Sequence, residues 1–297
     1  MKRHFLPAIS LSCVLVLLAS AILNSDRKPV GYDLASPDLA LVLPDTLREI
    51  SGAACIDSAT FACVQDENGI VFIYDLLKNQ VRQQYTFDID GDYEGITVVG
   101  QSLYVLRSDG MLYEISDYRS PAFQLTTYAT EIPALNNEGL CYDKDNHRLL
   151  IAAKGKIGKG PEYKDKRVIY GFDLNTKTPV KEPVFEFSVA TIKEFAKEHQ
   201  IVLPVRVKKQ GEITEPVLKF ATSAICIHPV TKKLFLLSAA DHMLFVFDMK
   251  GNIEHMEILD PDTFNKAEGI TFFENGDMLV TNEAQDKKPT VLRFNYR

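Results

Sequence analysis

Short apolar runs separated by polar turns recur along the chain in a fixed order. Each of five segments opens with a tripeptide, continues into an apolar strand and returns through a second and a third strand. The valine, isoleucine, leucine and aromatic content of these runs is typical of β-strands. The predicted second strands are residues 61–65, 103–107, 149–153, 234–238 and 278–282. The predicted third strands are residues 70–76, 111–115, 168–174, 243–249 and 290–296.

The spacing of the openings indicates the architecture. A period near 44 residues, with about four short strands in each repeat, is typical of a β-propeller blade. We therefore predict an all-β, five-bladed β-propeller, with six blades as the alternative because one step is almost doubled. The five openings begin at Ser51, Glu94, Glu138, Ser223 and Glu268, in steps of 43, 44, 85 and 45 residues.

The long step is better explained by an insertion in the third blade, at about residues 155–222, than by a hidden sixth blade. No opening tripeptide occurs between Gly139 and Ser223. Part of this stretch also has the spacing of an amphipathic helix, whose apolar face would hold Val189, Ile192, Phe195 and Ala196. Ser188 is placed to cap this helix.

The two ends of the propeller are expected to close the ring. Only three strands follow Glu268, and the run 39–43 before the first opening is a spare strand. Pairing of this run with the last blade, as its outermost strand, would remove an exposed sheet edge.

The first residues have the order of an export signal. Lys2 and Arg3 precede an apolar run, residues 5–23, that contains a small-x-small site at residues 19–21. The run is also long enough for an uncleaved membrane anchor, so both alternatives stay open. We predict residues 1–23 as signal peptide or anchor, 24–36 as linker and 37–297 as the propeller. The expected location is the periplasm or cell envelope, with membrane contact only through an uncleaved N-terminal segment.

The net charge and the cysteine content limit the classes of partner and of site that the chain can have. The net charge of −7 gives no basic face for nucleic acid. Cys55 and Cys63 lie on adjoining predicted strands, so a disulfide is an option, although small apolar strand residues are the favoured interpretation. No cysteine pair has CxxC spacing, which removes the usual signature of a zinc or redox site.

The repeat also predicts a site. The first strand of a propeller blade is the innermost, so the five opening residues should meet at one mouth of the central channel. Carboxylates crowded there repel one another, and a hard cation with oxygen ligands would relieve the repulsion. Calcium is favoured over zinc because no opening carries histidine or cysteine. The alternative is a solvated acidic rim. Of the openings, Glu94, Glu138 and Glu268 are predicted metal ligands, and Ser51 and Ser223 are predicted to line the mouth.

The second strands run back to the same mouth and add further candidates. Their ends place Glu283 as a fourth predicted metal ligand, with Asp66 and Lys154 as mouth residues. Lys154 begins a lysine-rich loop that either holds an anionic group over the cation or is simply solvated. His228, which precedes Pro229 in a predicted turn, is expected to be solvated. Familiar hydrolase motifs such as GxSxG and HExxH are absent.

Several of these motifs together resemble the SdiA-regulated family of bacterial extracytoplasmic proteins. The resemblance covers most of the chain after about residue 36 and rests on the order of the motifs. It implies a five-bladed propeller, distantly similar to NHL-repeat proteins, with a calcium site, and it implies no particular activity. The motifs are 49–52, 92–96, 137–140, 223–225 with His228-Pro229, and 267–270 with Asn282-Glu283.

Two functions remain open at this stage. The first is a calcium-binding recognition module for an envelope protein or a small anionic ligand. The second is a metal-dependent hydrolase, phytase-like or lactonase-like, in which the axial cation acts on a phosphoester or lactone. Fold alone cannot separate them. The discriminating feature would be an open coordination position on the cation beside a concave pocket, which the sequence does not show.

Overall fold

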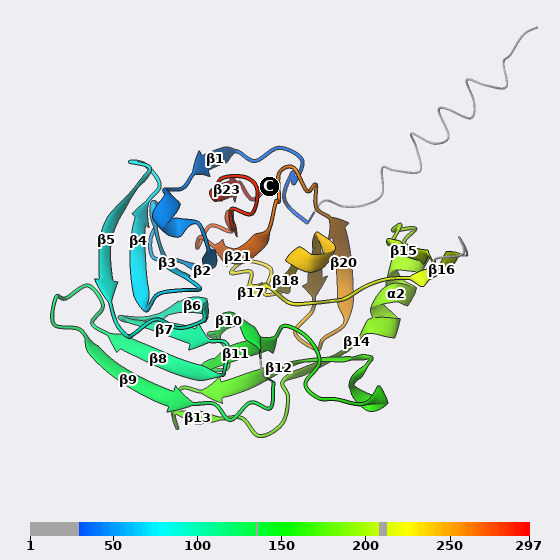
Figure 1. Cartoon of the computed structure of the whole chain (residues 1–297), viewed down its shortest axis with the longest axis horizontal. Helices are drawn as coiled ribbons and strands as arrows, with labels where there is room; N and C mark the ends of the chain where they lie inside the picture. Colours follow the sequence, from blue (N-terminus) through cyan, green and yellow to red (C-terminus); the bar gives the residue numbers. More distant parts are fainter. Residues whose placement is uncertain (1–29, 135, 208–212) are drawn as a thin grey trace, which may run out of the picture.

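The computed structural model describes residues 30–134, 136–207 and 213–297. The predicted export segment therefore lies outside the described residues. Five antiparallel sheets surround a central axis, with β2, β6, β10, β17 and β21 innermost (Figure 1). The chain is thus a five-bladed β-propeller, as predicted, and no sixth blade occurs within the described ranges. In these same ranges no helix is long and apolar enough to cross a membrane.

The strands of each blade follow one another from the axis outward. Blade 1 contains β2 (Ile50–Cys55), β3 (Thr60–Gln65), β4 (Ile70–Asp75) and β5 (Gln80–Thr86), and blade 2 contains β6 (Tyr93–Val99), β7 (Ser102–Arg107), β8 (Met111–Ser116) and β9 (Gln124–Ala129). Blade 3 contains β10 (Asn137–Asp143), β11 (Arg148–Ala153) and β12 (Lys166–Asp173), with β13 (Thr178–Pro179) and β14 (Phe185–Ser188) both paired to β12. Blade 4 contains β17 (Ala224–Ile227), β18 (Leu234–Ser238), β19 (Met243–Phe247) and β20 (Ile253–Ile258), and blade 5 contains β21 (Ala267–Phe272), β22 (Met278–Asn282), β23 (Thr290–Phe294) and β1 (Leu39–Val42). Short 3-10 turns lie at Asp45–Leu47, Pro161–Tyr163 and Ala239–Asp241.

Each blade packs face to face against its two neighbours, which explains why the inner strands are apolar on both faces. Every residue of β3 and β22 is buried, whereas the outermost strands β5 and β9 are mostly exposed. The buried side chains form five clusters, one at each blade interface. The hydrophobic effect therefore holds the ring together at five similar contacts, and no single central core exists.

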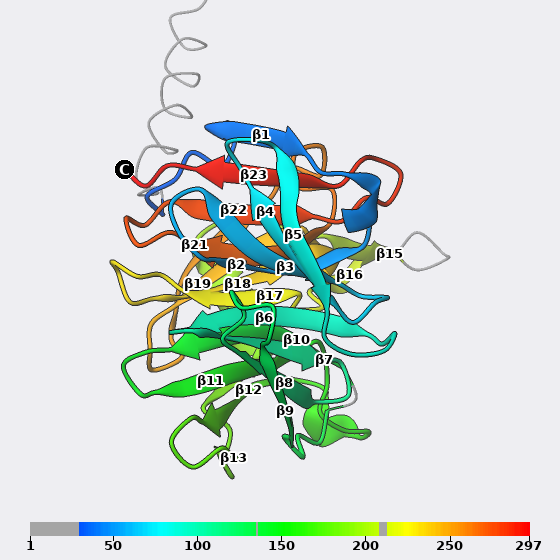
Figure 2. The same cartoon turned by 90° about the vertical axis from the view of Figure 1, so that its left-hand side faces the viewer.

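The ring closes as predicted, through the N-terminal strand. β1 pairs antiparallel with β23, with Leu39 opposite Arg293 and Val42 opposite Thr290 (Figure 2). The edge of blade 5 is thereby covered.

A second contact ties the N-terminal segment to blades 4 and 5. His228 is fully buried there, so the expectation that it is solvated is wrong. Its Nδ1 accepts from the backbone N–H groups of Val230 and Thr231, and its Nε2 donates to the hydroxyl of Tyr32 at 2.7 Å. That hydroxyl donates in turn to the carbonyl of Gly276. Burial lowers the pKa of His228 to about 4, which keeps the ring neutral.

The insertion in blade 3 holds the α-helix that the sequence predicts. Helix α2 (Val189–Glu198) begins at Ser188, whose side chain accepts from the backbone N–H of Thr191 at 3.1 Å. Val189, Ile192 and Ala196 are buried in the cluster between blades 3 and 4, with Phe195 packed against it. A short hairpin, β15 (Val205–Val207) with β16 (Ile213–Pro216), follows the helix.

The four cysteines within the described ranges are free thiols. In blade 1, Cys63 lies opposite Ala53 and Cys55 lies opposite Phe61, so the two cysteines are not directly paired across the strands. The interpretation as small apolar strand residues therefore holds, and the optional disulfide is not formed.

Candidate ligand site at the channel mouth

The three glutamates that open blades 2, 3 and 5 sit in β-bulges. The strand register shifts by one residue at Glu94, at Glu138 and at Glu268, and a similar shift occurs at Ser51 and Gly52. A bulge places an extra residue opposite a single partner and redirects its side chain. The repeated bulge thus turns these glutamates, called here the axial carboxylates, toward one mouth of the channel.

Below the axial carboxylates a layer of glycines lets the innermost strands approach closely. A Cβ atom added to Gly95 would lie 2.7 Å from Cβ of Leu140, and one added to Gly52 would lie 2.8 Å from the backbone nitrogen of Ile96. The space left on the axis is only about 10 Å³, roughly the lower limit for one water molecule. Any larger ligand must therefore enter from the mouth.

Glu138 is the most deeply buried of the axial carboxylates, with 2% of its surface exposed. Its Oε1 is paired with the ammonium of Lys154 and accepts from Nδ2 of Asn136 at 3.2 Å. Its Oε2 is buried and has no hydrogen-bond partner in the part of the chain that the structure describes. Burial raises the pKa of Glu138 to about 7 in spite of the opposing effect of Lys154.

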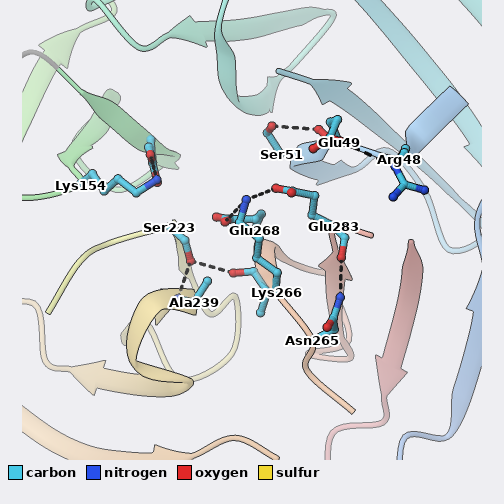
Figure 3. A network of polar contacts seen from close by, with 12 residues as sticks. Arg48, Glu49, Ser51, Lys154, Ser223, Ala239, Asn265, Lys266, Glu268 and Glu283 are labelled. Carbon is cyan, nitrogen blue, oxygen red and sulfur yellow. Dashed lines mark hydrogen bonds and ion pairs between the residues drawn. The ribbon is translucent and has the colours of Figure 1, made fainter. Parts of the chain in front are cut away.

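A second lysine bridges two other carboxylates of the mouth. Nζ of Lys266 lies 3.3 Å from Oε1 of Glu268 and also pairs with Oε2 of Glu283 (Figure 3). Burial raises the pKa of both carboxyls, to about 7 for Glu283, and Lys266 opposes the rise in each. The same contacts raise the pKa of Lys266, so its ammonium stays charged.

Glu94 and Asp66 lack such a lysine partner. Burial raises the pKa of Glu94 to about 9, and the neighbouring carboxylates, chiefly Glu138 and then Asp92, add to the rise. Burial also raises the pKa of Asp66 to about 6, with Glu49 as the main charged neighbour. Oδ1 of Asp66 is buried without a hydrogen-bond partner among the described residues. At neutral pH Glu94 is therefore a neutral acid, whereas Asp66 is mostly ionised.

The two predicted mouth serines are bound to the backbone. Ser223 donates from Oγ to the carbonyl of Ala267 at 2.7 Å and accepts from the N–H of Ala239. Ser51 donates to the carbonyl of Glu49 at 3.2 Å. Both side chains are buried, so they stiffen the mouth where adjacent strands begin.

Lys266 is the important residue that the sequence analysis missed. It lies two positions before an opening residue, and the same offset in the other blades gives Glu49, Asp92, Asn136 and Ala221. In four blades the carbonyl at this position accepts from the backbone N–H of the residue that directly follows the second strand. These bonds link Glu49 to Asp66, Asp92 to Ser108, Asn136 to Lys154 and Lys266 to Glu283. Extending the repeat two residues upstream would have found this second ring.

Beyond Lys154, two basic residues of the lysine-rich stretch, Lys166 and Arg167, bind groups other than the carboxylates of the mouth. Lys166 belongs to β12 and pairs with Glu186 at 2.9 Å. Arg167 is buried, and its guanidinium donates to the carbonyls of Lys219 and Phe220. These two residues therefore fix the insertion in place.

A cavity of about 270 Å³ opens beside the axis, over blades 4 and 5. Glu268 lines both this cavity and the axial space, so the two are adjacent. Lys154 and Lys266 also face the cavity. The remaining lining residues are Ala221, Ser223, Ala239, Ala240, His242, Asn265 and Gln285.

The mouth has more carboxyls than ammoniums, but it has no ready metal geometry. Five carboxyls (Glu94, Glu138, Glu268, Glu283 and Asp66) face two ammoniums (Lys154 and Lys266). Nowhere in the described ranges do three or more histidine, cysteine, aspartate or glutamate side chains form a group that could hold a metal. The unpaired oxygens of Glu138 and Asp66 are nevertheless the kind of donor that a cation takes.

Comparisons with known proteins establish the fold alone. No family model matches the chain, and no curated protein matches its sequence. Among solved structures, a glutaminyl cyclase from Myxococcus xanthus is similar, with a TM-score of 0.55, 14% identity, and 88% of this chain and 95% of that chain covered. A streptogramin B lyase is similar with a TM-score of 0.46 and 13% identity over 86% of this chain and 97% of that chain. A luciferin-regenerating enzyme gives a TM-score of 0.47 and 10% identity over 88% of this chain and 95% of that chain.

Proposed function

We propose that the protein is an extracytoplasmic recognition propeller of the SdiA-regulated type. In this proposal its axial carboxylates hold a calcium ion and its mouth binds a small anionic ligand or an envelope protein. The supporting observation is the half-paired carboxylate of Glu138, whose buried Oε2 has no hydrogen-bond partner among the described residues, in a mouth with more carboxyls than ammoniums. A buried acceptor without a partner is costly, and a bound cation would remove the cost.

The residues fit a cation only after a rearrangement. Glu94, Glu138 and Glu268 would hold the ion, with Glu283 as a further ligand, and Lys154 and Lys266 would have to leave their present partners. Calcium tolerates irregular geometry and six to eight oxygen ligands, so it suits such a site better than magnesium. Bound calcium would supply positive charge at the axis. Because Glu94 and Glu138 are partly protonated near neutral pH, its binding should also release protons.

The test is calorimetric titration of calcium into chelator-treated protein in two buffers of different ionisation enthalpy. We expect saturable binding of about one ion with proton release, greatly weakened in Glu138→Gln. Glu254→Gln is the matched control, because Glu254 lies on β20, the outermost strand of blade 4, and likewise pairs with a lysine, Lys233. Failure of the wild-type protein to bind calcium would exclude the cation site and leave the carboxylates as an acidic rim.

The compartment is part of the proposal and rests on residues 1–23 alone. Cell fractionation, combined with N-terminal sequencing of the purified protein, tests it. A mature N-terminus after about residue 21 supports export with cleavage, and an intact N-terminus in the membrane fraction supports an anchor. Intact protein in the cytoplasm would contradict the proposal.

The cavity beside the axial carboxylates keeps a hydrolase as the second candidate. A concave pocket next to a candidate cation site is what a metal-dependent hydrolase requires, and a carboxylate that does not bind the cation would act as the general base. Phosphate monoesters and lactones are the substrates to assay with calcium. Turnover abolished by Glu138→Gln and retained in Glu254→Gln would favour the hydrolase over a pure binding role.

A further inference from the structure

The two lysines of the mouth stand between the axial carboxylates and the cavity. Each ammonium is bound to carboxylates, and both lysines line the cavity of about 270 Å³. Lys154 enters from the end of β11 in blade 3, and Lys266 enters just before β21 in blade 5. The pair thus converges on one cavity from two different blades.

The ammoniums still have hydrogen-bond donors to offer. A lysine ammonium has three N–H donors. Lys154 uses one on Glu138, and Lys266 uses two on Glu268 and Glu283, so three N–H groups remain. The other polar wall groups are largely committed, because Ser223 donates to the Ala267 carbonyl and Asn265 donates to the Glu283 carbonyl. The lysines are therefore the main positive donors left for a ligand.

We propose that the cavity binds a small molecule through one carboxylate or phosphate group held by Lys154 and Lys266. We further infer that this oxyanion and the axial cation strengthen each other's binding, a coupling that rests on the function proposed above. A cation on the carboxylates would free both ammoniums to turn toward the cavity. An oxyanion on the ammoniums would in turn free the carboxylates for the cation.

Thermodynamic linkage makes this coupling measurable from both sides. If calcium raises the affinity for the oxyanion by some factor, the oxyanion must raise the affinity for calcium by the same factor. Simple electrostatic attraction at the surface would also respond to salt, but it would not depend on these two lysines. The coupling therefore needs both a reciprocal titration and lysine variants.

The experiment titrates succinate, and separately methyl phosphate, into chelator-treated protein and into protein saturated with calcium. We expect at least one of the two anions to bind at least about fivefold more tightly with calcium, the lower end of typical allosteric couplings. Calcium should bind more tightly by the same factor when that anion is saturating. The anion that binds more tightly identifies the ligand group as carboxylate or phosphate.

The variants Lys154→Gln and Lys266→Gln should lose anion binding while retaining calcium binding. Lys233→Gln, which removes a lysine paired with Glu254 on blade 4, should bind the anion like the wild type. Thermal unfolding of each variant shows whether it is folded. Should neither anion bind the wild-type protein, or should both lysine variants bind as it does, the cavity proposal is overturned.

The result that overturns the coupling between calcium and the anion differs from the result that overturns anion binding in the cavity. Anion binding of equal affinity in calcium and in chelator overturns the coupling. Absence of calcium binding, seen in the calcium titration itself, overturns the function proposed above. In that case the chelator arm still measures whether Lys154 and Lys266 hold the anion.

Discussion

The ammonium of Lys154 pairs with only one oxygen of the Glu138 carboxylate, and the other oxygen is buried with no hydrogen-bond partner within the described ranges. A buried carboxylate is ordinarily stabilised by partners on both oxygens, so this one is half satisfied. Burial raises its pKa in spite of the contact with Lys154. Such an arrangement suits a site that exchanges partners better than one that serves only to stabilise the fold.

Removal of the Lys154 charge should increase calcium affinity in the absence of an anion. Lys154→Gln takes away a positive charge that competes with calcium for Glu138, and a unit charge at about 4 Å contributes roughly 1–4 kcal/mol. We expect the calcium dissociation constant to fall about tenfold in calorimetric titration. Lys233→Gln should leave it unchanged, and weaker calcium binding in Lys154→Gln would contradict the competition.

The free energy of unfolding should depend on pH because carboxyls at the channel mouth have raised pKa values. Glu94 has a folded pKa of about 9, above its ordinary value of 4.5, so the folded state holds more protons than the unfolded state between these values. The free energy of unfolding must then decrease as pH rises through this window. Glu138 and Glu283, with pKa values of about 7, contribute in the same direction between pH 4.5 and 7.

Chemical denaturation at pH 7 and at pH 9 tests mainly Glu94, because Glu138 and Glu283 are already about half ionised at pH 7. The wild type should be less stable at pH 9 than at pH 7, and Glu94→Gln should lose most of this difference. Saturating calcium should also reduce it. A wild-type protein equally stable at both pH values would show that Glu94 has an ordinary pKa.

The propeller was accessible from the sequence because each blade repeats the same pattern of apolar strands. Five openings in order fixed the number of blades, and the surplus of 41 residues in the long step fixed the insertion. Closure by β1 followed from counting the strands of the last blade. These features depend on hydrophobic periodicity and length, which a single sequence records directly.

The positions of Glu94, Glu138 and Glu268 also followed from the repeat, but their partners did not. Which lysine reaches which carboxylate depends on side-chain direction between neighbouring strands of one blade, which the spacing along the chain does not record. Lys266 and Glu283 are 17 residues apart, and Lys154 and Glu138 are 16 apart. His228 was misjudged because its partner Tyr32 is 196 residues away. Local turn chemistry could not reveal that contact.

The glycine layer should be intolerant of even one methyl group. Gly95→Ala would place a Cβ 2.7 Å from Cβ of Leu140 and 3.1 Å from the carbonyl of Glu138. Overpacking of this kind costs about 1–3 kcal/mol, and relief of the clash would move the bulge that directs Glu138. We expect lower stability together with weaker calcium binding.

Gly155→Ala is the matched control for the glycine layer. No heavy atom lies within 4 Å of a Cβ at Gly155, so the free energy of unfolding of this variant should stay within about 0.5 kcal/mol of the wild-type value. Chemical denaturation and calcium titration of both variants test whether only Gly95→Ala loses stability and calcium affinity. Equal behaviour of the two variants would mean that the inner strands have room to separate.

The buried contact between Tyr32 and His228 should contribute strongly to ring closure. Tyr32→Phe removes the acceptor of the His228 Nε2 proton and the donor to the Gly276 carbonyl, leaving both groups buried and unpaired. Loss of such partners costs about 1–3 kcal/mol. The midpoint of chemical denaturation should therefore fall without a change in slope.

Tyr118→Phe provides the contrast, because the Tyr118 hydroxyl is buried with no hydrogen-bond partner among the described residues. Its removal takes away a polar group that gains nothing from burial, so stability should be unchanged or slightly increased. The two variants delete the same atom from the same residue type. If they destabilise the protein equally, the loss in Tyr32→Phe comes from packing, and the link between the N-terminal segment and His228 contributes little to closing the ring.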